Sequence, residues 1–244
     1  MENIDSPTAA ILLFIASSAA FVLSKRRTRR QPSLTSSINI YKTLILPIFI
    51  DKVCASTPVL EQRLKIVPLA KGEVLELGIG SGLNLPHYNP GTVTKVVGVD
   101  PDDYLWKRSA KRRLMCRIPV EHIGLSGENI PLPDQIFDCA VVTFSLCTIP
   151  DAVKALKEVK RLLKPEGKLY FLEHGKAPEK NIVKWQRRIE PYSKIACGGC
   201  SPGKDIPSLL EEAGFKIDDM KSAYVPMGPK LWSYNYWGEA SVEK

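Results

Sequence analysis

Three alternating glycines after an apolar stretch are the residues whose spacing says most about chemistry. Residues 74–77 read Val-Leu-Glu-Leu, and glycines follow at positions 78, 80 and 82. Glycine has no Cβ, so the backbone can turn sharply there and lie close against a ligand. A strand that runs into such a loop forms a nucleotide site at the carboxyl edge of an open α/β sheet. The same glycines also fit a simple tight turn, so the assignment depends on further signals.

The spacing after this loop excludes a dinucleotide as the ligand. A dinucleotide fingerprint requires the pattern G-x-G-x-x-G. Leu83 and Leu85 occupy the two positions where a third glycine of that pattern could stand. What remains is E-x-G-x-G-x-G, in which Glu76 places an acidic residue two positions before the first glycine.

Asp100 supplies the second signal, at the end of the next predicted strand. Residues 94–99 are mostly apolar, and Asp100-Pro101 follows about 20 residues beyond the glycine loop. A carboxylate at this position can accept both ribose hydroxyls of an adenosine, and its charge strengthens each bond. Aspartate is also a common helix cap, but its place in the order of elements favours a nucleoside ligand.

Side chains after two further strands are expected at the same edge of the sheet. The run that ends at Phe144 is almost continuously apolar, as in a central parallel strand that is buried on both faces. Phe144 and Ser145 therefore face the ligand. The strand 168–172 ends in Glu173 and His174, and a histidine titrates near neutrality and could take a proton from an acceptor thiol or hydroxyl. We interpret both as candidate catalytic residues, with structural bonds between loops as the alternative.

The cysteines predict neither a nucleophile nor a metal site. The six cysteines are scattered along the chain, which fits a reducing compartment better than a disulfide framework. Cys147 lies near the ligand edge but has no partnered base in the sequence pattern. Cys197 and Cys200 form C-x-x-C, which is half a zinc site, and no second pair or histidine couple accompanies them. No bound metal is predicted.

Positioning these residues requires a Rossmann-like α/β fold. The predicted sheet is mostly parallel and seven-stranded, and an antiparallel hairpin of residues 216–224 and 231–240 closes it. An amino-terminal hydrophobic helix precedes the sheet. The expected helices of the domain span residues 58–69, 83–88, 103–117, 152–163, 181–196 and 206–213.

Composition excludes several other classes of protein. The chain has 244 residues, of which 44% are hydrophobic and 25% charged, so one globular domain is expected. The net charge of +8 fits nucleic acid or an anionic membrane surface. Six basic residues lie in the predicted helix 103–117, and its two aromatic residues precede the basic run instead of alternating with it, as residues that stack on bases would. We interpret this helix as a solvated face and expect no nucleic-acid partner.

The amino terminus predicts attachment to a membrane. Residues 7–23 are apolar or small, and a basic cluster follows at residues 25–30. The positive-inside rule then places the domain in the cytosol. A helix lying in one leaflet with the basic cluster on phospholipid head groups is the alternative geometry. The predicted organisation is a membrane anchor with a basic flank (1–30), a linker with an interfacial or lid segment (31–57), and the globular domain (58–244).

These motifs together resemble a known family. Residues 72–175 are similar to the type 11 domain of class I S-adenosylmethionine (SAM) methyltransferases. The whole chain resembles the membrane-anchored thiol S-methyltransferases of the methyltransferase-like-seven group. The features that match are L-E-L-G-x-G-x-G, the strand end F-S-L-C-T, the run L-K-E-V-K-R-L-L-K-P-E-G-K-L-Y-F-L-E-H, and the closing Tyr-Trp-Gly.

The resemblance implies a SAM cofactor and a small thiol acceptor, with the protein on the cytosolic face of the endoplasmic reticulum or on lipid droplets. It also implies that Glu128 and Asn129 flank the adenine. A thiol acceptor needs little activation, because a few per cent is already thiolate at pH 7. The cofactor-binding residues expected on all these grounds are Glu76, Gly78, Ile79, Gly80, Gly82, Asp100, Pro101, Glu128, Asn129, Phe144 and Ser145.

Two other functions remain open from the sequence. The anchor also fits a lipid or quinone methyltransferase, because those acceptors reside in the bilayer. A non-catalytic SAM-binding protein that recruits partners to a membrane would keep the same fold without turnover. The intact acidic and glycine positions of the predicted site favour an enzyme over the recruitment protein.

Overall fold

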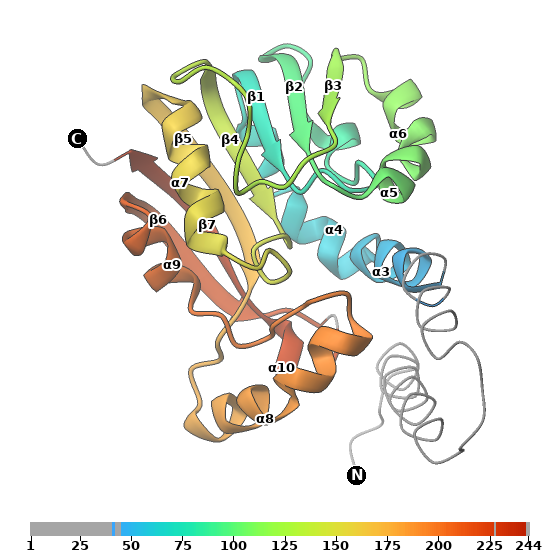
Figure 1. The fold of residues 1–244 in the computed structure, drawn as a ribbon, viewed down its shortest axis with the longest axis vertical. Helices are drawn as coiled ribbons and strands as arrows, with labels where there is room; N and C mark the ends of the chain where they lie inside the picture. The colour runs from blue at the N-terminus through green and yellow to red at the C-terminus, as the bar shows by residue number, and fades with distance from the viewer. Residues whose placement is uncertain (1–40, 42–44, 227, 243–244) are drawn as a thin grey trace.

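The computed structural model describes residue 41 and residues 45–226 and 228–242, which form a seven-stranded mixed sheet with helices around it (Figure 1). The strand order is β3-β2-β1-β4-β5-β7-β6, and β7 runs antiparallel to both of its neighbours. The predicted, mostly parallel sheet with antiparallel closing strands is therefore confirmed. Its strands are β1 (Gly72–Leu77), β2 (Val93–Val99), β3 (Val120–Ile123), β4 (Phe137–Thr143), β5 (Leu163–His174), β6 (Phe215–Tyr224) and β7 (Tyr234–Val242).

The helices cover both faces of the sheet and its carboxyl edge. Figure 1 shows α7 and α9 in front of the sheet, and α3 and α4 beyond the carboxyl ends of the central strands. The α-helices are α3 (Leu46–Cys54), α4 (Thr57–Arg63), α5 (Asp103–Arg108), α6 (Ala110–Met115), α7 (Ala152–Leu162), α8 (Lys180–Ala196), α9 (Ile206–Glu212) and α10 (Lys230–Ser233). Two short 3₁₀ turns are η2 (Val67–Leu69) and η3 (Leu85–His87).

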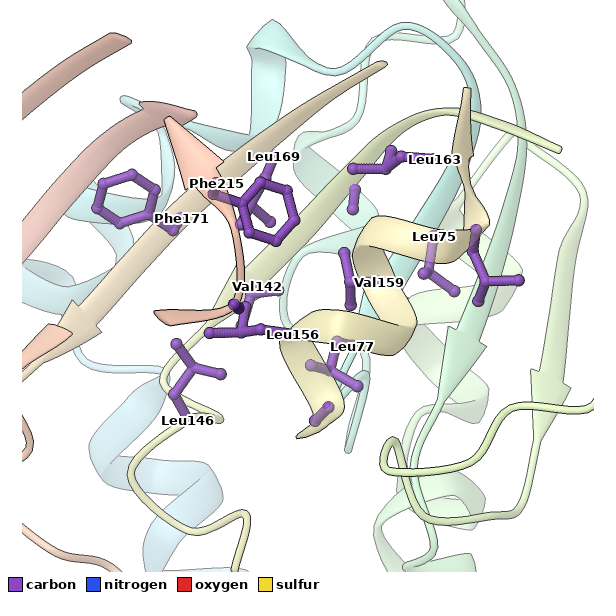
Figure 2. Close-up of a cluster of buried hydrophobic side chains, with 14 of the residues drawn as sticks. Leu75, Leu77, Val142, Leu146, Leu156, Val159, Leu163, Leu169, Phe171 and Phe215 are labelled. Atoms are coloured by element: carbon purple, nitrogen blue, oxygen red, sulfur yellow. The ribbon is translucent and has the colours of Figure 1, made fainter. Parts of the chain in front are cut away.

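The central strands are buried on both sides, so each divides its side chains between two cores. Successive side chains of a strand point to opposite faces. Leu75 and Leu77 of β1 therefore pack with Leu156 of α7 in one cluster (Figure 2). Val74 belongs to the cluster on the other face. Burial of each such aliphatic side chain contributes about 1.5–3 kcal/mol, and this packing fixes the strand ends that carry the site.

Four element predictions were wrong in their details. The predicted helix 58–69 ends at Arg63, and a turn and η2, which contains Pro68, follow it. The predicted helix 83–88 is a turn with η3, because Pro86 and the following Asn89-Pro90 stop a longer helix. The predicted helix 103–117 breaks into α5 and α6 at Ser109, whose buried hydroxyl donates to the carbonyl of Trp106 at 2.6 Å. The last strand begins at Tyr234 rather than residue 231, because α10 precedes it.

The predicted amino-terminal hydrophobic helix and its basic flank lie outside the described residues. Within the described part of the chain, none of the helices combines the length and apolar character needed to cross a membrane.

Candidate active site

A cleft of about 660 Å³ lies at the carboxyl ends of β1, β2 and β4. The glycine loop forms one wall, the segment after β4 forms another, and α3 covers part of the opening. This is the edge at which open α/β sheets bind their ligands. Among the predicted cofactor residues, those that line the cleft are Glu76, Gly78, Ile79, Gly80, Asp100, Pro101, Phe144 and Ser145.

The glycine loop has a backbone conformation that side chains rarely permit. Gly78, Gly80 and Gly82 have φ angles of +75°, +48° and +72°, which lie in the left-handed region that favours glycine. A Cβ on Gly78 would lie 2.1 Å from the hydroxyl oxygen of Ser145. The first glycine therefore lets β1 and the segment after β4 approach each other across the floor of the cleft.

Asp100 is fixed beside the glycine loop by backbone donors. Its Oδ2 accepts a hydrogen bond from the N–H of Gly80 at 2.9 Å, and its Oδ1 accepts one from Asp102 at 2.8 Å. Burial raises the pKa of Asp100 above its ordinary value, although both backbone bonds oppose this shift. Each carboxylate oxygen keeps acceptor capacity for a further donor, so the carboxylate can bind a diol in the cleft.

Glu76 is a buried carboxyl group at the end of β1. The amide of Asn84 donates to its Oε1 at 3.0 Å, and the hydroxyl of Tyr88 donates to its Oε2 at 2.7 Å. Burial raises the pKa of Glu76 to about 7, against the opposing effects of Tyr88 and Arg63. The group therefore changes protonation near neutral pH, within reach of a bound cation.

Arg63, at the end of α4, is a site residue that the sequence did not reveal. Its side chain is buried and donates to Oδ1 of Asn84 at 2.8 Å and to Oγ1 of Thr143 at 2.7 Å. The guanidinium lies 5.2 Å from the centre of the Phe144 ring. Its Nε has no hydrogen-bond partner in the described part of the chain. Arg63 lines the cleft, and a buried cation there is suited to an anionic group of a ligand.

Helix α3 is joined to the glycine loop by an ionic cluster around Asp51. The hydroxyl of Ser81 donates to the Asp51 carboxylate, and Arg108 and Arg112 form ion pairs with it at 3.3 and 3.1 Å. Burial alone would raise the pKa of Asp51, but its bonds with Ser81 and Arg112 keep it below the ordinary value. Two of the basic residues interpreted as a solvated face therefore position α3 over the cleft.

Glu173 lies behind the cleft wall rather than in it. It is fully buried, and its Oε1 accepts the backbone N–H groups of Ser145 and Leu146 at 2.7 and 3.1 Å. Its Oε2 has no partner among the described residues, and burial raises its pKa to about 7. The geometry makes Glu173 a positioning residue for the segment after β4, in which Phe144 has an unusual φ of +53°.

His174 lies at a second, smaller cavity of about 140 Å³, which is almost entirely apolar. Phe144 and Thr148 line both this cavity and the larger cleft, so the two spaces adjoin. The His174 ring lies 6.5 Å from the Phe144 ring, and its Nε2 lies 3.4 Å from Sγ of Cys200. A hydrogen bond with Cys200 and burial raise the pKa of Cys147 well above its ordinary value.

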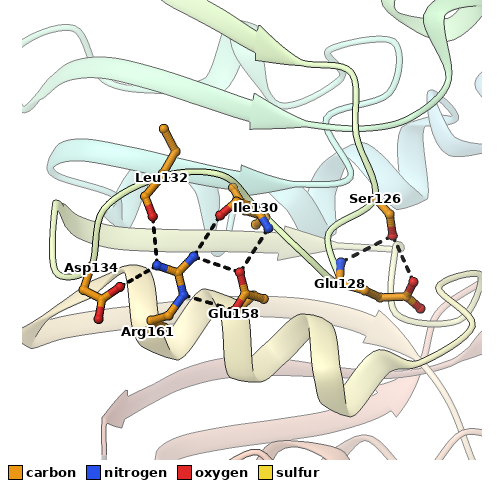
Figure 3. A network of polar contacts seen from close by, with 7 residues as sticks. All are labelled: Ser126, Glu128, Ile130, Leu132, Asp134, Glu158 and Arg161. Atoms are coloured by element: carbon orange, nitrogen blue, oxygen red, sulfur yellow. Dashed lines mark hydrogen bonds and ion pairs between the residues drawn. The ribbon is translucent and has the colours of Figure 1, made fainter.

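Glu128 and Asn129 lie outside the residues that line the cleft. Glu128 accepts the N–H of Asp151 at 2.7 Å. Figure 3 shows its second bond, from the hydroxyl of Ser126 at 3.0 Å. Asn129 is exposed. Arg161 of α7 donates to the carbonyls of Ile130 and Leu132, which fastens this loop to the helix. The two residues just before Glu128, Ser126 and Gly127, line the cleft instead.

This fold and this site define a class I SAM-dependent methyltransferase. The family of the methyltransferase domain matches residues 75–171, the stretch from β1 to β5. Thiol S-methyltransferase TMT1B of Homo sapiens is 30% identical over 215 residues, which cover 82% of this chain and 86% of that protein. The Rattus norvegicus TMT1B is 34% identical over 170 residues, 65% of this chain and 68% of that protein. The chain belongs to this methyltransferase family.

Solved structures agree on the fold. A SAM-dependent methyltransferase from Aquifex aeolicus superposes with a TM-score of 0.55 at 21% sequence identity, covering 80% of this chain and 98% of that one. At this level of identity the likeness concerns the architecture alone. The acceptor must be inferred from the side chains of this chain.

Proposed function

We propose that this enzyme transfers the methyl group of SAM to a small apolar thiol. The observation that carries the proposal is the small apolar cavity that shares Phe144 and Thr148 with the cofactor cleft. An acceptor in that cavity would lie beside the methyl donor, where positioning supplies most of the rate enhancement. The cavity volume of about 140 Å³ suits a short alkyl or aryl thiol better than a lipid headgroup with its chains.

The residues of the cleft fit SAM, which supplies an electrophilic methyl group on a sulfonium. Asp100 would accept the ribose hydroxyls, because its oxygens keep acceptor capacity beside the glycine loop. The guanidinium of Arg63, which lines the cleft, would pair with the carboxylate of the methionine portion. Glu76, buried close to Arg63, would balance the ammonium group. These three side chains would match the ribose diol, the carboxylate and the ammonium group of the cofactor.

His174 would act at the acceptor. Its ring lies among the residues of the apolar cavity, and an imidazole can accept the proton that a thiol loses. The reaction would be a direct displacement in which the acceptor sulfur attacks the methyl carbon and the bond to the sulfonium sulfur breaks.

The test of this proposal is a panel of acceptors, assayed with labelled SAM and the full chain in detergent. We expect turnover with hexanethiol and thiophenol. The panel also has a phosphatidylethanolamine arm and a quinol arm, which distinguish thiol methylation from methylation of a lipid or a quinone. Turnover confined to either of those arms would overturn the thiol assignment. SAM binding without turnover in any arm would favour the recruitment protein.

We further propose that residues 1–30 attach the enzyme to phospholipid, with the catalytic domain in the cytosol at the endoplasmic reticulum or lipid droplets. The apolar run and the basic flank that follows it support this placement. Membrane fractionation of the full chain and of a chain without residues 1–30 tests it. Equal sedimentation of both chains with membranes would contradict the role of this segment.

The affinity for SAM is expected to rise with pH between about 6 and 7.5. Because burial raises the pKa of Glu76 to about 7, the free enzyme is partly protonated there, and a bound ammonium group favours the ionised carboxylate. Binding would therefore release a proton. The ionisable groups that act on Glu76 are Arg63, Tyr88 and Asp100.

Calorimetry in buffers of different ionisation enthalpy measures this release directly. A Glu76→Gln variant, which keeps a similar shape, is expected to lose both the proton release and the rise in affinity. Equal proton release by the variant and the parent enzyme would show that another group is responsible.

A further inference from the structure

Three metal-ligating side chains converge at the wall of the apolar cavity. Cys147 follows β4, His174 ends β5, and Cys200 lies between α8 and α9. Their ligand atoms all lie within 4.8 Å of one another. The three residues are 4%, 6% and 8% exposed. They come from parts of the chain that are far apart in sequence, so C-x-x-C spacing did not reveal the group.

The distances suit a tetrahedral metal. Zn²⁺ bonds to cysteine sulfur at about 2.3 Å and to histidine nitrogen at about 2.0 Å, so the donor atoms of such a site lie roughly 3.5–3.8 Å apart. The Sγ of Cys200 lies 3.4 Å from Nε2 of His174. The longest separation in the group exceeds the tetrahedral spacing by at most about 1 Å, which a small χ1 rotation of a cysteine removes.

The backbone around the group is fixed by hydrogen bonds. The N–H of Ser201 donates to the carbonyl of Cys147 at 2.9 Å, which joins the segments that carry the two cysteines. Glu173 accepts two N–H groups from the segment that leads into Cys147. Lys204 donates to the carbonyls of Leu146 and Ile149, which lie before and after that cysteine. Such preorganisation is what a metal site requires of its scaffold.

The charge balance also favours a divalent cation. Two cysteine thiolates and a neutral imidazole bring a net charge of −2, which a divalent metal neutralises. A neutral centre can be buried in an apolar cavity without a further counter-ion, whereas an unpaired charge there is costly. Soft thiolate ligands with one imidazole select zinc over magnesium or calcium.

We propose that Cys147, His174 and Cys200 bind one zinc ion whose fourth position opens to the apolar cavity and takes up the acceptor sulfur. Three protein ligands and one open position are the pattern of catalytic zinc sites, as opposed to closed structural ones. This inference rests on the proposed thiol substrate and deepens it. His174 then acts as a metal ligand in place of a proton acceptor.

The proposed step balances in atoms and charge. The acceptor thiol loses its proton to solvent when its sulfur binds the metal, because a coordinating thiol is deprotonated. A sulfur lone pair then forms a bond to the methyl carbon of SAM, and the broken bond leaves its electron pair on the sulfonium sulfur. The products are a neutral thioether, which is a weaker zinc ligand and can leave, S-adenosylhomocysteine and the released proton.

Cobalt substitution of the full chain in detergent, under a non-thiol reductant, tests the site without SAM or acceptor. We expect one Co²⁺ per chain, with thiolate-to-cobalt charge transfer and the visible bands of tetrahedral cobalt. Cys147→Ser and Cys200→Ser should each lose the charge-transfer intensity. Cys197→Ser is the matched control, because Cys197 lines the same cavity but is not one of the three ligands, and it should keep the spectrum. SAM binding by each variant checks that it has folded.

Addition of hexanethiol should change the charge-transfer band, and the corresponding methyl thioether should leave it nearly unchanged. Failure to bind cobalt, an unaltered spectrum in Cys200→Ser, or a Cys147–Cys200 disulfide in mass spectra of the reduced protein would overturn the metal site. Thiol turnover that survives removal of zinc by chelation would overturn the metal's role and leave the proposed function intact. A cobalt-binding chain that methylates no thiol would overturn the proposed function alone.

Discussion

Asp100→Ala is expected to weaken SAM binding by about 100-fold. A hydrogen bond to a charged group contributes about 1.5–3 kcal/mol, and each 1.4 kcal/mol corresponds to a factor of ten in affinity. The variant removes the carboxylate proposed to accept both ribose hydroxyls, in a cleft where burial already raises its pKa. Isothermal calorimetry with the purified full chain measures the change.

Two further variants separate loss of the ligand contact from damage to the fold. Asp103→Ala removes a carboxylate in the first turn of α5 that does not line the cleft, and it should bind SAM within about twofold of the parent, as surface substitutions usually have small effects. Asp100→Asn keeps one acceptor oxygen for the N–H of Gly80 and should give an intermediate affinity. Parent-like affinity in Asp100→Ala would show that the ribose assignment is wrong.

The sheet and the cleft were predictable because their signals lie in short, continuous stretches. A parallel strand buried on both faces is an apolar run, as in β4. The residue that follows such a strand must lie at the ligand edge. The glycine loop and Asp100 therefore specified where the cofactor cleft forms before any contact was known. The turn at η3 differs from the predicted helix because Pro86 and Pro90 prevent a longer helix despite the local helical pattern.

Residues whose role depends on distant partners could not be predicted. Arg63 lies in a seven-residue helix without a motif, and its partners Asn84 and Thr143 are 21 and 80 positions away. Asp51 likewise meets Arg112 across 61 positions. Neither the spacing of motifs nor the composition predicts such contacts between distant residues. The loop after β3 is the opposite case. The sequence motif predicts Glu128 in the cleft, but this side chain instead accepts the N–H of Asp151 at the start of α7.

Glu173 also acts through partners that are distant in sequence, and it supports the segment that borders both the cleft and the apolar cavity. It sits on β5 and receives hydrogen bonds from Ser145 and Leu146, 28 and 27 positions earlier in the chain. The segment it positions supplies Phe144, which lines both spaces, and Cys147, which lines the apolar cavity. A change at Glu173 should therefore affect stability and turnover together.

Glu173→Ala is expected to lower the free energy of unfolding by about 3 kcal/mol, because two buried N–H groups each lose their acceptor at a cost of about 1–3 kcal/mol. For a chain of this size, that corresponds to a fall in Tm of roughly 6–12 °C. Thiol turnover should fall more than SAM affinity, since the acceptor side depends on the position of Phe144 and Cys147. Thermal unfolding and the acceptor assay measure the two effects.

The controls for this variant test whether the two N–H groups are the cause. Glu212→Ala removes an exposed carboxylate from α9 and should leave both the Tm and turnover nearly unchanged. Glu173→Gln keeps an oxygen that can accept both N–H groups, but it places an amide N–H₂ where the buried Oε2 has no partner among the described residues. Its Tm should therefore fall between those of the parent and Glu173→Ala. A Gln variant as unstable as the Ala variant would indicate that the charge of Glu173, and not its acceptor geometry, stabilises the segment.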